Sequence, residues 1–160
     1  MGGWFFLAGL LFQGVGLEGT GALAPDSDAP IDLAAERCEV FENEDTARCA
    51  GAVRLVQGDA ILTADEMTIF GFSHPDGVRR IEGSGNVRYA SGPNAISGAT
   101  AVYDASATTI TVTGDVVVIQ GDQIMAGGEL VYNTATGALQ FSPGADGRVR
   151  GLFYSAAQRQ

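Results

Sequence analysis

The fold is decided by residues 51–70, GAVRLVQGDAILTADEMTIF. Two later stretches align with it without a gap: residues 85–104, GNVRYASGPNAISGATAVYD, and residues 114–133, GDVVVIQGDQIMAGGELVYN. Each unit begins with glycine, has valine two residues later and has another glycine seven residues after the first. A half unit, LAAERCEVF at residues 33–41, matches residues 62–70. Repetition of this kind predicts like units stacked in one domain.

Apolar residues alternate with polar ones inside each unit, and a period of two is typical of strands. Arg54, Asp65, Arg88 and Thr100 have the opposite parity to the apolar set. We therefore expect an all-β protein of antiparallel strands with one apolar and one wet face. The expected inward residues are Val53, Leu55, Met67, Ile69, Ile81, Val87, Tyr89, Tyr103, Ile110, Val112, Val116, Val118, Leu130, Tyr132, Val149 and Phe153.

The third unit departs from this alternation, because Val117 and Ile119 place apolar side chains on the face that is polar in the first two units. Two interpretations are open. The strand is covered on both sides, or it pairs with a partner.

Glycines and turn residues predict where the chain changes direction. Gly58, Gly92 and Gly121 close the first strand of each unit, and glycine inside a strand usually marks a bulge or corner, so we expect the strands to bend there. Short turns are predicted at residues 42–45, 105–108 and 133–137, and a longer loop at residues 71–78. Bent strands stacked in this way would form a curved trough.

The N-terminus is typical of a secretory signal peptide, assigned to residues 1–24. An apolar run, WFFLAGLLF at residues 4–12, is followed by small residues, with cleavage after Ala22 or Ala24. The run is too short to span a bilayer, which takes about 20 residues. The alternative is an uncleaved amphipathic anchor. Residues 25–30 are then a mature N-terminal lead.

Cys38 and Cys49 are expected to form a disulfide. Both belong to an exported chain, and an even cysteine count in an oxidising compartment favours pairing. With the first turn centred between Asn43 and Glu44, the two cysteines lie directly opposite each other and share the inward parity. A zinc site is not expected, since two thiols and the lone His74 do not complete a tetrahedral set.

Composition excludes several other functions. The chain has 160 residues, enough for one ordinary domain, and 9 Arg against 19 Asp plus Glu give a net charge of -10, which argues against a nucleic-acid partner. No catalytic site, metal or cofactor is predicted: the carboxylates of residues 42–45 crowd one turn and are best explained as solvated. Arg54 and Arg88 occupy equivalent positions in the first two units. They either contact lipid phosphate or are ordinary residues of the solvent face.

Taken in order, these motifs resemble the OstA-like (LptA) family of periplasmic proteins. The motifs are Pro30-Ile31 at a strand start, GxVxhxQG, the strand of residues 64–69, and the closing FSPGADGRVRGLFY. The resemblance covers residues 30–155. It implies a single β-jellyroll of stacked antiparallel strands, open along one seam, over residues 31–155, with residues 156–160 as a tail.

The family resemblance also implies a function. The protein would carry lipopolysaccharide from the inner to the outer membrane, with the acyl chains of lipid A held in the apolar interior. Copies would associate head to tail, between inner-membrane and outer-membrane components of the transport machinery. A sheet of stacked hairpins ends in two unpaired edges, near residues 31–35 and 149–154, and we expect these edges to form the junctions. The alternative is a structural β-repeat scaffold without lipid cargo, because residues that line a groove also fill an ordinary core.

Overall fold

The computed structural model describes residues 29–145 and 147–154, and they form one antiparallel sheet. One short 3-10 turn, Glu42–Glu44 (η1), is the helical element of this part of the chain, and no described helix has the length and apolar character to cross a membrane. The strands are β1 (Ile31–Ala34), β2 (Arg37–Phe41), β3 (Thr46–Gln57), β4 (Ala60–Phe70), β5 (Arg80–Ser91), β6 (Asn94–Asp104), β7 (Thr109–Gln120), β8 (Gln123–Asn133), β9 (Leu139–Ser142) and β10 (Arg150–Leu152).

Each repeated unit forms one long hairpin: β3 with β4, β5 with β6, and β7 with β8. The connecting turns have two residues, and the first of them is Gly58, Gly92 or Gly121, with φ near +58° in each case. Positive φ at the first central position is the pattern of a type II′ turn, which glycine favours and which matches the twist of the strands. The expectation that the strands bend at these glycines was therefore wrong.

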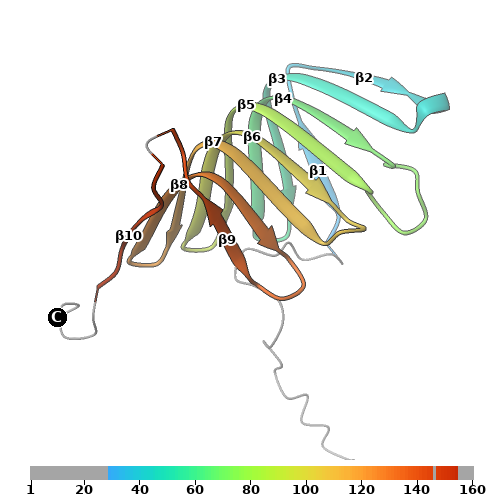
Figure 1. The fold of residues 1–160 in the computed structure, drawn as a ribbon. Helices are drawn as coiled ribbons and strands as arrows, with labels where there is room; N and C mark the ends of the chain where they lie inside the picture. The colour runs from blue at the N-terminus through green and yellow to red at the C-terminus, as the bar shows by residue number, and fades with distance from the viewer. Residues whose placement is uncertain (1–28, 146, 155–160) are drawn as a thin grey trace, which may run out of the picture.

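The strands bend instead at the glycine that starts each unit. Gly51 has φ +81° and Ala52 has φ +46°, and these two residues lie opposite one residue of β4, which makes a β-bulge. Gly85 with Asn86 and Gly114 with Asp115 repeat the arrangement. The three bulges occupy equivalent positions in β3, β5 and β7, so the whole sheet folds along one line across the strands (Figure 1).

Folding along this line divides the sheet into two layers that face each other (Figure 1). We call them layer A and layer B. Layer A contains β1, β10 and the segments next to the two-residue turns, residues 53–64, 87–98 and 116–127. Layer B contains β2, β9 and residues 46–50, 66–84, 100–113 and 129–133.

The apolar core lies between the layers. All the predicted inward residues from Val53 to Tyr132 are buried, except Tyr103, which is half-buried and packs against the core. Val149 and Phe153 were expected inside but are 40% and 56% exposed. The reason is that β10 pairs over only three residues at the end of the sheet, and both side chains lie outside that paired segment.

The sheet is open, as expected, because β1 and β10 end it and no described strand joins them. Each end is made of two short strands separated at the fold line. At the N-terminal end β1 and β2 pair with different halves of β3, and at the C-terminal end β10 and β9 pair with different halves of β8. Strand β9 was not predicted from the sequence.

Candidate functional site

A narrow cavity of about 60 Å³ lies between the two layers. Gln57 and Ala60 place it at the free end of layer A, because these residues flank the β3–β4 turn. Both layers contribute apolar walls. The lining residues are Leu55, Gln57, Ala60, Leu62 and Tyr89 from layer A and Ile81, Ala101, Tyr103 and Ile110 from layer B.

Strand register explains why these side chains face each other. On layer A, Leu55 is opposite Leu62, which is opposite Tyr89 on the next strand. On layer B, the equivalent row runs through Ile81 and on to the residues opposite it on β6 and β7. The next row of layer B has Gly83 opposite Ala101, and Ala101 lines the cavity. The layers pack closely at Gly83, where an added Cβ would lie 3.5 Å from the Cβ of Ala64 on layer A.

The interior is electrically neutral. The buried residues of the described chain include no charged side chain, and the one buried polar residue, Thr46, donates its hydroxyl to the carbonyl of Glu44. Burial raises the pKa of the Tyr89 phenol, and the neighbouring Tyr132 and Tyr103 raise it further. The phenol of Tyr89 therefore stays uncharged at neutral pH, and the environment suits hydrocarbon better than ions.

The size of the cavity limits what it holds as it stands. Preformed sites for small molecules usually measure about 300–1,000 Å³, several times the volume found here. A long hydrocarbon chain therefore fits only if the layers move apart.

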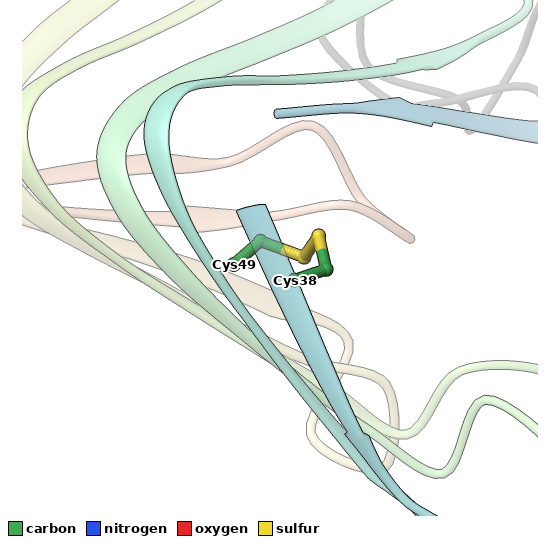
Figure 2. The surroundings of a disulfide bond; sticks show 2 residues. All are labelled: Cys38 and Cys49. Atoms are coloured by element: carbon green, nitrogen blue, oxygen red, sulfur yellow. A yellow bond between two sulfur atoms is a disulfide. The ribbon is translucent and has the colours of Figure 1, made fainter. Parts of the chain in front are cut away.

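The apolar interior reaches the N-terminal end of the sheet. Here the inner face of β2 carries Val40, which is 57% exposed, and Cys38, also exposed. Cys38 lies opposite Cys49 on β3, as the sequence predicted, and a disulfide joins them with an S–S distance of 1.98 Å. Figure 2 shows the bond connecting the two strands. The disulfide thus ties the short edge strand to the long one.

At the C-terminal end, Leu139 and Phe141 of β9 are partly buried and pack against the core. Beyond them the chain exposes Phe153 at 56%. The interior is thus apolar from one end of the sheet to the other.

The remaining candidate residues do not gather at this site. His74 lies in the loop between β4 and β5, where its Nδ1 accepts a hydrogen bond from the Asp76 backbone N–H. Arg54 and Arg88 are exposed on the outer face of layer A. The described residues hold no group of three or more potential metal ligands. The predicted signal peptide and the predicted tail, residues 156–160, lie outside the described residues.

An open antiparallel sheet folded onto a neutral apolar interior defines a β-jellyroll of the kind that the sequence motifs predicted. The family described as LptA/(LptD N-terminal domain) LPS transport protein matches residues 32–138. The chain belongs to this family.

The known proteins that are similar to the chain include one from a Rhizobium and one of solved structure. An uncharacterized protein of Rhizobium meliloti (strain 1021) is 31% identical over 132 residues, which are 78% of this chain and 70% of that protein. The crystal structure of LptH from Pseudomonas aeruginosa, described as the LptA homologous periplasmic component of the conserved lipopolysaccharide transport device, superposes with a TM-score of 0.72. That match covers 82% of this chain and 99% of LptH at 19% identity, so it bears on the fold.

Proposed function

We propose that this protein is a periplasmic bridge component of lipopolysaccharide transport, and that the space between its layers shelters the acyl chains of lipid A. The observation that carries the proposal is the uncharged interior, which is apolar on both layers and reaches both ends of the sheet. Membership of a lipopolysaccharide transport family supports the same cargo.

Burial of hydrocarbon supplies the affinity. Each methylene removed from water contributes about 0.8 kcal/mol, so about ten of them contribute about 8 kcal/mol, the free energy of a micromolar complex. Part of this energy is spent in separating the layers, because the existing cavity is narrow. The free ends of layer A and layer B are the place to open, since the layers are continuous only along the line of bulges.

Copies of the protein would continue the apolar interior by joining head to tail. Exposed large apolar residues gather at the two ends of the sheet: Ile31 and Val40 at one end, and Val149, Leu152, Phe153 and Tyr154 at the other. Edge strands also offer unpaired backbone donors and acceptors to an incoming strand. Inner-membrane and outer-membrane components of similar fold would bind by the same pairing.

A photo-crosslinking experiment tests the cargo. A photoreactive residue at Leu55, which lines the cavity, is compared with one at Val56, its neighbour on the outer face. Cells that export lipopolysaccharide should yield a lipopolysaccharide adduct from position 55 and not from position 56.

The same experiment separates the proposal from its alternative, a structural scaffold without lipid cargo. The small volume of the cavity is the observation that favours the scaffold. A second photoreactive residue is placed at Val118, an inward position on β7. Equal labelling at positions 55 and 56 would exclude the lipid-binding proposal. The absence of an adduct from both inward positions, 55 and 118, would exclude it too.

A further inference from the structure

The outer face of layer A carries a row of apolar residues, one from each of the seven strands β3 to β8 and β10, and β1 ends the row with Asp32 opposite Val56. Strand register defines the row, because each member lies directly opposite the next on the neighbouring strand. We call it the outer apolar row, and it consists of Val56, Ile61, Ala90, Ala95, Ile119, Ile124 and Leu152.

This row is unusual for the outer surface of the sheet. Ile119 and Ile124 are both 40% exposed and Leu152 is 50% exposed, while the other members are half-buried. The equivalent row on layer B is interrupted by the charged residues Glu39, Arg48 and Glu82. A contiguous apolar stripe on one outer face marks an interaction surface more often than scattered apolar residues do.

Charged residues flank the row on both sides. Arg54 precedes Val56 by two residues, and Asp59 precedes Ile61 by two residues. Because β3 and β4 are antiparallel, Arg54 lies on the fold-line side of the row and Asp59 lies on the turn side. Both are exposed, and neither forms an ion pair with another described residue.

We propose that the outer face of layer A is a docking surface for a second copy of this chain, packed face to face about a two-fold axis that runs along the outer apolar row. This axis places the row of one copy on the row of the other. It also exchanges the two sides of the row, so each Arg54 comes to lie over Asp59 of the other copy. An axis along the strands would keep the two sides of the row separate, so that Arg54 could not reach Asp59 of the other copy.

The size of the surface predicts a weak dimer. Seven strands spaced about 4.8 Å apart give a row about 29 Å long, and one residue position of the same face on either side gives a width of about 14 Å. The two copies together would bury about 800 Å², which is below the standard interface size. The pairing uses side chains of the outer face and leaves the backbone edges of β1 and β10 unpaired, so it would join head-to-tail chains side by side, and it does not depend on lipid cargo.

Cysteine crosslinking of the exported protein tests the geometry. The axis places Ile61 over Ile61 of the other copy, so Ile61→Cys should form an intermolecular disulfide under mild oxidation. Thr111→Cys is the matched control, because Thr111 is equally half-buried and lies on the outer face of layer B. End-to-end association does not bring two copies of position 61 together, so the test distinguishes the two modes.

Charge reversal tests whether a second copy of this chain is what binds the outer face of layer A. In the Ile61→Cys background, Arg54→Asp should weaken self-association at least about tenfold, because it sets carboxylate against carboxylate. Adding Asp59→Arg should restore crosslinking. The proposal is overturned if Ile61→Cys crosslinks no better than Thr111→Cys, or if the double reversal does not rescue. It is also overturned if the face binds phosphatidylglycerol vesicles through Arg54 without a 61–61 crosslink.

Discussion

Val87 and Arg88 are adjacent in β5 but lie in opposite environments, since Val87 is 1% exposed and Arg88 points to water. Val87→Asp would bury a charge without a partner, and such a change typically costs about 4 kcal/mol or more. We expect thermal melting to show a fall of more than about 10 °C, with loss of lipid binding. Arg88→Ser should change neither strongly. If both variants melted alike, the assignment of inner and outer faces would be wrong.

Tyr89 should make stability sensitive to alkaline pH. Its pKa is raised by burial in the folded protein, whereas the unfolded chain ionises near pH 10. The stabilisation is therefore complete below pH 10 and is lost as pH rises further, because only the unfolded state then readily releases the proton. Urea unfolding between pH 8 and 11 should show this loss, with a smaller loss in Tyr89→Phe. An identical pH profile in the two proteins would contradict the prediction.

Residue-level prediction worked where a strand is long and paired on both sides. Val53 and Leu55 lie inside because side chains alternate between the two faces of a strand, so burial of one face fixes the direction of every second residue. It did not work for Val149 and Phe153, which have the right parity but flank a strand of three residues. Parity alone does not show whether a neighbouring strand covers a side chain.

Among the strands, β7 contains a bulge glycine, Gly114, and is followed directly by a turn glycine, Gly121. Gly114 has φ +85°, and a Cβ there would lie 2.5 Å from the Cβ of Ala99. Gly121 follows β7 with φ +58° and no atom within 4 Å of an added Cβ. Gly121→Ala should thus lower the free energy of unfolding by about 1 kcal/mol, because alanine disfavours the positive φ. Gly114→Ala should lower it clearly more, because the added Cβ also collides with Ala99. Equal losses in chemical unfolding would show that the bulge is not a close-packed corner.

The sequence predicted the hairpins but placed the bends at the wrong glycines. The glycine that starts each unit and the glycine seven residues later recur equally regularly in the sequence. Only the φ angles of the residues that follow them distinguish a bulge from a turn. Ala52, Asn86 and Asp115 share the second bulge position with positive φ, although alanine carries no signal for that conformation. The four-residue strand β9 was missed because it is too short for a periodic pattern.

The disulfide should stabilise one edge rather than the whole sheet. Cys38 and Cys49 close a short loop, so the chain-entropy contribution is about 3 kcal/mol. In a Cys38→Ser, Cys49→Ser variant we expect faster hydrogen exchange in β2 and little change in β7. Peptide mapping of the exported protein without reductant should recover the linked pair. Two free thiols there, or uniform loss of protection across all strands, would contradict this prediction.

At the scale of the whole molecule, the repeats and family motifs led to an open jellyroll, and the structure has that form. The volume between the layers could not be predicted, because it depends on how closely side chains of the two layers approach each other across the core, which the sequence does not show. The outer apolar row was visible only as an irregularity at Val117 and Ile119. Register was needed to show that Ile119 belongs to a row crossing the sheet.

The two ends of the sheet predict head-to-tail assembly of the whole molecule. The ends of the sheet differ, so joining the C-terminal end of one copy to the N-terminal end of the next is a heterologous contact that need not close. Oligomers should therefore grow with concentration and have no fixed size. Deleting residues 148–160 removes β10 but keeps the β3–β8 hairpins and β9, so the truncated chain should fold while its oligomers shorten. Circular dichroism checks the fold, and light scattering over a wide concentration range measures size. A folded truncation that forms the same oligomers would show that the β10 edge is not the junction.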